Sequence, residues 1–232
     1  MAKDINTAPL DSHLLEEAGV PSETIEAFET HFQLLLRWNK VHNLTRVTHS
    51  AEATRKHYLD SWLGTLEVEG QFPKAPWENG LWDIGSGAGF PGIACALRWK
   101  TPMVWVEPSS KRVSFLTLVK QELDLGHVEI QNGRLEDMPQ EGLADGLMIS
   151  RATFPWQNWR PHLLKHPVSH LALWCGKDPT LQEWQAHLQE MSASETWIGS
   201  HAVVEVPHTE FRQILFASPK SFLESTSSHS NP

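Results

Sequence analysis

Residues 81–97 read LWDIGSGAGFPGIACAL, in which four glycines and a proline separate two apolar runs. The first run predicts a short buried strand, and the second predicts a helix. A glycine-rich turn between a strand and a helix is typical of nucleotide-binding loops, because glycine tolerates positive φ and lets the backbone approach a ligand. The stretch therefore predicts an α/β fold with a ligand site at the carboxyl end of the first strand.

The spacing of these glycines limits which nucleotide the loop can hold. A dinucleotide fingerprint that begins at Gly85 and Gly87 would need glycine or alanine at the position of Phe90, and the glycine falls at Gly89 instead. A P-loop is excluded because no Lys-Ser or Lys-Thr pair follows the glycines. The loop thus lacks the third glycine that a pyrophosphate would require.

An acidic residue ends the next apolar run, at the place where a ribose would lie. Glu107 closes the run MVWVE, twenty residues after Gly87, and in open α/β sheets a carboxylate at this point accepts from ribose hydroxyls. The alternative is an ordinary acid at a strand end beside Pro108. A glycine loop and a ribose acceptor without a pyrophosphate site predict a nucleoside ligand such as S-adenosylmethionine. The pattern G-x-G-x-G with this acid resembles class I methyltransferases.

The chain divides into a helical part and an α/β part. Apolar residues recur at helical spacing in residues 10–18 and 22–40, where Ser22 is the expected N-cap, and a third helical segment starts near Ser50. From residue 81, short apolar runs alternate with helical stretches, which predicts βαβ units and a parallel sheet covered on both faces. We expect a helical cap over residues 1–68, a methyltransferase domain over residues 69–219 and a disordered polar tail over residues 220–232.

The α/β part is expected to hold three helices and two kinds of strand. The expected helices cover residues 91–99, 110–125 and 178–191. The expected parallel strands are the runs LWDI, MVWVE, HVEIQ, GLMIS and HLALWC. Two further runs, WIGSHAVVEV and FRQILFASP, predict an antiparallel pair that closes the sheet.

Composition and charge exclude several classes of protein. The 232 residues have a formal net charge of −9, with 20% charged and 40% apolar residues, which is ordinary for a globular protein and argues against non-specific wrapping of nucleic acid. No apolar run approaches the ~20 residues that span a bilayer, and the acidic N-terminus lacks the apolar core of a secretory signal. Cys95 and Cys175 have no metal-ligand spacing, so we expect buried thiols, a cytoplasmic protein and no membrane association.

Two windows nonetheless combine basic and aromatic residues. Residues 31–58 carry five Lys and Arg against one acid, and residues 150–177 carry four without an acid, among several aromatic rings. Cations beside rings suit RNA, whose phosphates meet the charges while unstacked bases lie on the rings. The alternative is a solvated helix face over core aromatics. The candidate RNA contacts are Arg46, Arg55, Lys56, Lys111, Arg112 and Lys177.

Five motifs occur together along the chain. They are LLLRWNKVHNLT (residues 34–45), RKHYLDSWL (55–63), DIGSGAGFPGI (83–93), VEPSSKRVSFL (106–116) and ISRA (149–152). In this combination the chain resembles the bacterial small-subunit rRNA methyltransferase G family, also called glucose-inhibited division protein B, from about residue 25 to 177. The resemblance implies a Rossmann-like class I methyltransferase fold with an N-terminal helical extension. It also implies methyl transfer from S-adenosylmethionine to N7 of a guanine in 16S ribosomal RNA.

The resemblance also assigns cofactor contacts to individual residues. At matching positions they are Gly85, Phe90, Leu135, Glu136 and Arg151. Gly85 admits the backbone to the methionine portion and Phe90 offers a flat apolar surface, whereas Arg151 meets the methionine carboxylate or an RNA phosphate. The ribose argument adds Glu107 to this set. The chain departs from the family at Lys56, where arginine is usual, and in a looser later segment that contains Lys177.

Methylation of guanine N7 does not require a general base. N7 carries an exposed lone pair, so the enzyme has to align three atoms, and proximity can contribute ~7–11 kcal/mol. We therefore expect no catalytic side chain. His57 and Asp60, an i, i+3 pair on one helix face, are expected to brace the cap against the cofactor domain. His162, His166 and His170 recur every four residues, but prolines interrupt that segment and no metal site is expected.

Three functions stay open at this point. The first is methylation of 16S rRNA by a monomer, with a small-subunit ribosomal particle as the expected substrate because an acidic chain binds bare RNA weakly. The second is a methyltransferase for a small molecule or a protein, which would leave the two basic windows without a role. The third is a nucleotide-binding module without catalytic activity.

Overall fold

A series of helices precedes the sheet. The structure, a computed structural model, describes residues 8–138, 146–151, 155–159, 170–190, 197–206 and 212–219, so the expected tail at 220–232 lies outside the described residues. The first helices are α1 (Ser12–Glu17), α2 (Ser22–His42), α3 (Ser50–Ala53), the π-helical turn η1 (Thr54–Leu59) and α4 (Asp60–Gln71). The helical segments predicted before residue 69 are therefore confirmed.

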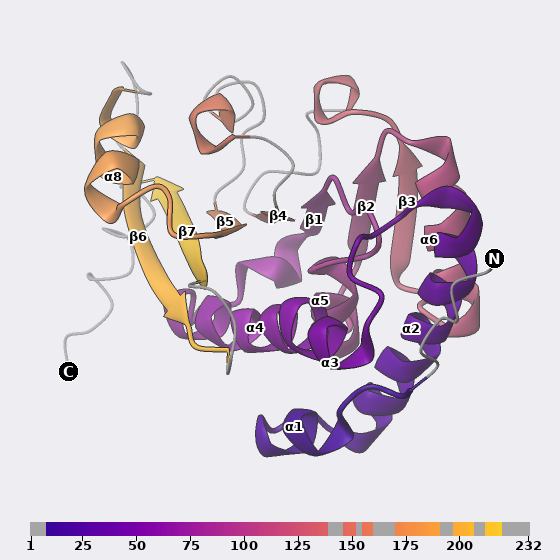
Figure 1. Ribbon diagram of the computed structural model, residues 1–232. Helices are drawn as coiled ribbons and strands as arrows, with labels where there is room; N and C mark the ends of the chain where they lie inside the picture. The colour runs from indigo at the N-terminus through magenta and orange to yellow at the C-terminus, as the bar shows by residue number, and fades with distance from the viewer. Residues whose placement is uncertain are drawn as a thin grey trace.

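A mixed sheet forms the centre of the molecule (Figure 1). Its strands are β1 (Leu81–Ile84), β2 (Met103–Glu107), β3 (Val128–Asn132), β4 (Leu147–Arg151), β5 (His170–Cys175), β6 (Trp197–Val204) and β7 (Arg212–Pro219). Their order is β3-β2-β1-β4-β5-β7-β6, in which β1 to β5 are parallel and β7 runs antiparallel to β5 and β6. Both the parallel strands and the closing antiparallel pair are as predicted.

Helices connect the strands and cover them. They are α5 (Gly92–Trp99), α6 (Ser110–Glu122) and α8 (Leu181–Glu190), with short 3-10 turns η2 (Pro76–Asn79), η3 (Leu135–Asp137) and η4 (Trp156–Trp159). The three helices predicted in this part are confirmed, with ends that differ by a few residues. In the described ranges, none of the helices combines the length and hydrophobicity that crossing a bilayer requires.

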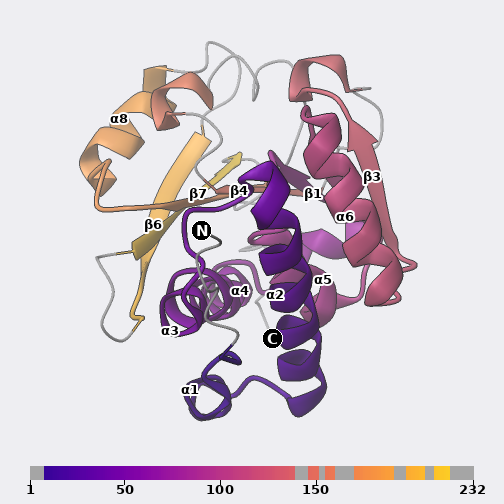
Figure 2. The ribbon, with the colours of Figure 1, turned by 45° about the vertical axis from the view of Figure 1, so that its right-hand side comes forward.

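The two faces of the sheet bury different side chains, because neighbouring residues of a strand point to opposite faces. In β1, Leu81 belongs to the large apolar cluster that also contains residues of α2, α4, α5 and α6. Trp82 and Ile84 belong to a smaller cluster with Trp184 of α8 and Trp159 of η4. Figures 1 and 2 accordingly show α8 on one side of the sheet and α4 and α5 on the other.

The N-terminal helices share their core with the sheet. Phe28 of α2 and Tyr58 of η1 are buried in the same cluster as Ile93 of α5. The boundary expected between residues 68 and 69 falls inside α4, which continues to Gln71. The cap and the sheet are therefore parts of one hydrophobic core.

Two local details differ from the predictions. Ser22 is the first helical residue of α2 and not its N-cap, because Pro21 precedes it in an extended conformation and its carbonyl accepts the first hydrogen bonds of the helix. The helix predicted after residue 50 contains one wider turn, η1, where the N–H of Asp60 bonds to the carbonyl of Arg55. A hydrophobic pattern does not reveal either feature, since both are settled by backbone hydrogen bonds.

Helix α4 approaches the sheet closely at a glycine. A Cβ at Gly64 would overlap the indole of Trp174 in β5, whose Cε2 would lie only 2.7 Å away. Gly70, in the same helix, is exposed, and a Cβ there would have no heavy atom within 4 Å. The contact between α4 and β5 therefore depends on the missing side chain at Gly64.

We expect Gly64→Ala to lower the free energy of unfolding by about 1–3 kcal/mol, because the added methyl group overpacks against Trp174. Gly70→Ala is the matched control in the same helix, and it should raise the free energy of unfolding by about 0.5–1 kcal/mol because alanine favours helix. Urea unfolding followed by circular dichroism measures both changes. Equal effects of the two substitutions would contradict the close packing at Gly64.

Candidate active site

The glycine loop lies at the carboxyl end of β1, between β2 and β4 in the sheet. Gly85, Gly87 and Gly89 have φ angles of 72°, 60° and 93°, a region that strains residues with a Cβ. Gly92 serves another purpose, since a Cβ there would overlap the carboxyl group of Asp83. Three glycines thus form the turn and the fourth permits packing beneath α5. The loop occupies the switch point at which open α/β sheets bind ligands.

A cavity of about 470 Å³ opens at this edge of the sheet. We call it the first cavity. Its lining comes from the glycine loop, from the ends of β2 and β4, from η3 and from the cap. The six residues predicted to contact the cofactor all line it, namely Gly85, Phe90, Glu107, Leu135, Glu136 and Arg151. They meet because the carboxyl ends of parallel strands lie at one edge of a sheet. Their roles toward a ligand stay predictions.

Glu107 fixes the loop from the side of β2. Its side chain is only 1% exposed, yet both oxygens are used: Oε2 accepts from the N–H of Gly87 and Oε1 from the N–H of Ser109, each at 2.9 Å. Arg112 Nη1 lies 3.8 Å from Oε1. A carboxylate offers about four acceptor sites, so roughly two remain for donors in the cavity.

A histidine of the cap fixes the loop from the other side. His31 of α2 is fully buried, with Nε2 at 3.0 Å from the carbonyl oxygen of Ala88 and Nδ1 at 2.7 Å from the hydroxyl of Tyr58. Because a carbonyl only accepts, Nε2 carries the proton and donates, and Nδ1 accepts from Tyr58. Burial lowers the pKa of His31 to about 4, so the ring is neutral near pH 7. One neutral imidazole thus links α2, η1 and the glycine loop.

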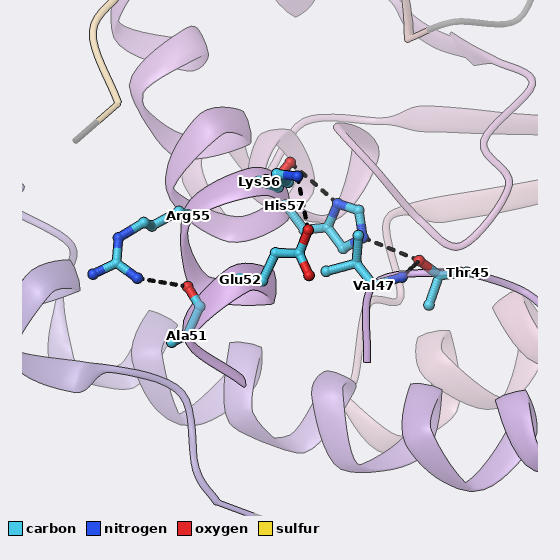
Figure 3. Close-up of polar contacts among 7 residues, drawn as sticks. All are labelled: Thr45, Val47, Ala51, Glu52, Arg55, Lys56 and His57. Carbon is cyan, nitrogen blue, oxygen red and sulfur yellow. Dashed lines mark hydrogen bonds and ion pairs between the residues drawn. The ribbon is translucent and has the colours of Figure 1, made fainter. Parts of the chain in front are cut away.

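A second histidine, His57 of η1, packs over Phe90 with ring centroids 4.7 Å apart. Its Nδ1 donates to the carbonyl of Lys56 at 3.1 Å, so Nε2 accepts from the hydroxyl of Thr45 at 3.2 Å (Figure 3). Burial and, to a smaller extent, the nearby charge of Arg151 lower the pKa of His57 to about 3. Phe90 is only 4% exposed. The ring therefore lines the first cavity with most of its surface covered by the cap, and its role as a flat apolar surface toward a ligand stays a prediction.

Arg151, at the end of β4, is held by the cap. Its Nη1 lies 3.3 Å from Asp60 Oδ2 and 3.3 Å from the carbonyl oxygen of Lys56, and its guanidinium carbon lies 5.0 Å from the centre of the Phe90 ring. Arg212 Nε approaches Asp60 Oδ1 at 3.7 Å. Burial raises the pKa of Asp60, and the two arginines oppose that shift. The predicted bracing of the cap is confirmed, because His57 packs on Phe90 of the glycine loop and Asp60 pairs with Arg151 of β4.

Of the basic residues predicted to contact RNA, two line cavities. Arg112 lies in the first cavity, beside Glu107. Lys56 lines a second cavity, and its Nζ is 2.7 Å from Glu52 Oε1 (Figure 3). These positions tie the two cations to carboxylates, which lowers the positive charge that they present to a phosphate.

The other four candidates are distributed over the surface. Arg46, Lys111 and Lys177 are exposed. Arg55 lines neither cavity described here, because its Nη1 donates to the carbonyl of Ala51 at 3.0 Å and its side chain extends to the opposite side of the helix from His57 (Figure 3). Contact of these residues with RNA stays a prediction.

The histidines and cysteines of the sequence form no metal centre in the described ranges, where no group of three His, Cys, Asp or Glu could hold an ion. His170 is buried at the start of β5, whereas His162 and His166 lie outside the described residues. Cys95 is buried and Cys175 is half-buried, and both are free thiols. The prediction of buried thiols therefore holds fully for Cys95 and in part for Cys175.

The family described as rRNA small subunit methyltransferase G (GidB) matches residues 24–205, which are 182 of the 232 residues. The chain belongs to this family. The resemblance inferred from the five motifs is thereby confirmed.

Curated relatives carry the same family name. The ribosomal RNA small subunit methyltransferase G of Streptococcus equi subsp. zooepidemicus (strain H70) is 38% identical over 130 residues, which are 55% of this chain and 53% of the relative. The protein of that name from Streptococcus pneumoniae (strain ATCC BAA-255 / R6) is 37% identical over 132 residues, 56% of this chain and 54% of the relative. The chain spans about half the length of the curated relatives it matches.

Solved structures share the fold at low sequence identity. The N-terminal domain of human METTL16 superposes with a TM-score of 0.54 at 10% identity, over 66% of this chain and 67% of that one. A human methyltransferase 10 domain containing protein gives a TM-score of 0.51 at 10% identity, over 67% of this chain and 82% of the other. The expected Rossmann-like class I methyltransferase fold with an N-terminal helical extension is confirmed.

Sequence reasoning missed several residues that this rRNA small subunit methyltransferase G family member places at the first cavity. Leu44 and Thr45 line it together with His57, and Arg134 lines it beside η3. The motif LLLRWNKVHNLT contains Leu44 and Thr45 and could have pointed to them. No local pattern places His31 against the loop, because its partner Ala88 is 57 positions away in the chain.

The buried His31 makes stability depend on pH. The unfolded chain protonates this histidine near pH 6.5, whereas the folded protein does so only near pH 4. Between these values the unfolded state binds more protons, so His31 costs stability as the pH falls from about 6.5 to about 4, by up to about 3 kcal/mol. Asp83 acts in the opposite sense in this window, because burial raises its pKa to about 7 and the folded state keeps its proton.

The variant His31→Gln separates these two effects, because glutamine retains an amide donor for Ala88 and does not titrate. We expect the wild type to lose free energy of unfolding relative to His31→Gln as the pH is lowered through this window. Urea unfolding of both proteins at several pH values measures the difference. Parallel pH profiles would contradict a buried neutral His31.

Proposed function

We propose that this protein transfers a methyl group from S-adenosylmethionine to N7 of a guanine in 16S ribosomal RNA. The observation that carries the proposal is the first cavity, where the glycine loop, Glu107 and Arg151 meet at the switch point of the sheet in a member of the rRNA small subunit methyltransferase G family. The protein would act as a monomer in the cytoplasm, where ribosomal particles are assembled.

The residues of the first cavity fit S-adenosylmethionine. Glu107 is held by two backbone N–H groups and keeps acceptor capacity for the ribose hydroxyls. Gly85 leaves the backbone open toward the methionine portion, whose carboxylate would meet the guanidinium of Arg151. Leu135 supplies a buried apolar wall and Glu136 lies next to it, where the adenine would lie.

The bound cofactor supplies an electrophilic methyl group on a positively charged sulfur. Because the N7 lone pair would accept this methyl group directly, no side chain of the protein would have to remove a proton. The chain therefore has to bind the cofactor and the guanine, orient them toward each other and exclude water from between them. Such proximity and orientation can lower the barrier by ~7–11 kcal/mol. His57, with a pKa of about 3, is too weak a base to abstract a proton. Its place beside Phe90 suits a role in shaping the cavity.

The charge of the chain bears on the form of the substrate. A net charge of −9 disfavours tight binding to bare RNA, because phosphate contacts supply most of that affinity. A small-subunit ribosomal particle can add protein contacts and present the target guanine in a fixed geometry. The exposed Arg46, Lys111 and Lys177 are the cations that can meet its phosphates.

S-adenosylmethionine binding tests the cofactor site. We expect Glu107→Gln to weaken it about 10–100-fold, because hydrogen bonds to a charged acceptor contribute about 1.5–3 kcal/mol. Glu129→Gln is the control, since Glu129 is an exposed residue of β3 that lines neither cavity. Isothermal titration calorimetry measures both affinities, and NAD should not bind. Equal affinities in the two variants would contradict a contact between Glu107 and S-adenosylmethionine.

Ribosomal RNA from a strain that lacks the gene tests the reaction. Mass spectrometry should show the loss of one 7-methylguanosine from the small-subunit RNA, because the proposed transfer is the source of that methyl group. The wild-type gene should restore the modification, and the Glu107→Gln gene should restore less of it. An unchanged content of 7-methylguanosine would contradict the proposed function. Equal rates of the purified protein on small subunits and on bare transcript would contradict the preference for a particle.

A further inference from the structure

A second cavity adjoins the first, and the cofactor placement proposed above does not occupy it. It measures about 430 Å³ and shares His57 and Arg151 with the first cavity. Its lining comes from the cap, from the ends of β4 and β5 and from β7. Among the described residues that form it are Lys56, Asp60, Trp159, Trp174, Gly176 and Arg212. A volume of this size falls within the usual range of small-molecule sites.

Two side chains, His57 and Arg151, lie at the boundary between the two cavities, and Arg151 supplies the charge there. Arg151 lines both, and among the described residues its Nη1 bonds two acceptors of the cap, the Asp60 carboxylate and the Lys56 carbonyl. Asp60 is 3% exposed and also faces Arg212. It therefore acts as a positioning residue that holds Arg151 at the junction. A guanidinium carries five N–H donors, and Nη1 supplies at most two of them.

We infer that the second cavity binds the acceptor guanine, with N7 toward the first cavity and O6 toward Arg151. The inference rests on the proposed function and names the site where its acceptor lies. N7 and O6 are neighbouring acceptors on the same edge of guanine. A base that presents N7 to the methyl group therefore brings O6 to the same junction. The positively charged guanidinium of Arg151 at that junction can donate a hydrogen bond to O6.

The same geometry selects guanine over adenine. Adenine carries an amino group in place of O6, so its N–H donors would face the donors of Arg151 and leave them unpaired. Sites built to satisfy a specific polar group reject analogues that lack it. The apolar part of the lining, which includes Trp159, Leu173 and Trp174, suits a base that has left its stack.

Filling the second cavity separates acceptor binding from cofactor binding. A Cβ at Gly176 would meet no heavy atom within 4 Å, and Gly176 does not line the first cavity. Gly176→Leu therefore adds a branched side chain to the lining of the second cavity without a clash among the described residues. Gly126→Leu is the matched control, because Gly126 is exposed, has the same open space at Cβ and lines neither cavity.

We expect Gly176→Leu to bind S-adenosylmethionine with wild-type affinity in calorimetry. Its methyl transfer to small subunits from the strain without the gene should fall about tenfold or more, because a branched side chain takes the volume of the base. Gly126→Leu should match the wild type in both measurements. Unimpaired methylation by Gly176→Leu would overturn the inference. Loss of S-adenosylmethionine binding in this variant would also overturn it, since the two cavities would then not be separate sites.

A nucleotide titration tests the cavity without any ribosomal substrate. With the protein saturated by S-adenosylhomocysteine, calorimetry should detect binding of guanosine monophosphate, weaker or no binding of adenosine monophosphate, and loss of the guanosine signal in Gly176→Leu. If the wild type binds guanosine monophosphate but does not methylate small subunits, the proposed substrate is contradicted. The inference that the second cavity binds guanine is still supported. Where the wild type is inactive on subunits, equal nucleotide binding in wild type and Gly176→Leu, or no binding in either, overturns the inference.

Discussion

The hydrogen bond from His31 to the carbonyl of Ala88 is the contact on which the arrangement of this site depends. The glycine loop contains three residues with positive φ, and it leaves the sheet after the N–H groups of Gly85 and Ser86, which bond to the carbonyl of Val106 in β2. Glu107 holds it from β2 through the N–H of Gly87, and His31 holds it from the cap. Burial lowers the pKa of this imidazole and the hydrogen bond to Ala88 opposes that shift, so the ring is neutral near pH 7 and donates to the loop. The cap is therefore part of the first cavity and not an appendage to it.

The second organising feature is the charge pairing around Arg151. A partly buried guanidinium needs compensation, and Asp60 supplies it from the first residue of α4, while Arg212 approaches the same carboxylate from β7. Elements from the two ends of the chain thus meet at one ion cluster. Since Arg151 lines both cavities, any change in the cap that moves Asp60 reaches both sites through one side chain.

Much of the fold and of the first cavity follows from local pattern. Five apolar runs became parallel strands, and residues that follow three of them, in the glycine loop and at Glu107 and Arg151, came together at one edge. Parallel strands dictate that meeting, because their carboxyl ends align. Phe90 shows the limit: its position follows from the loop, but its exposure depends on His57, which lies over it from the cap. Arg55 and Lys56, adjacent in sequence, point to different surroundings because they lie on a helix.

The amino-acid sequence by itself determined the strand–loop–helix unit, the acid at the end of β2 and the family, because periodicity, glycine placement and motif order are local properties of a chain. Tertiary structure alone decided which side chains close the site. His31 reaches a carbonyl 57 positions away, and Arg151 reaches a carboxylate 91 positions away. Such partners are chosen by how the helices pack on the sheet. No spacing along the chain encodes that packing, since it depends on the volumes and charges of all the groups that are buried together.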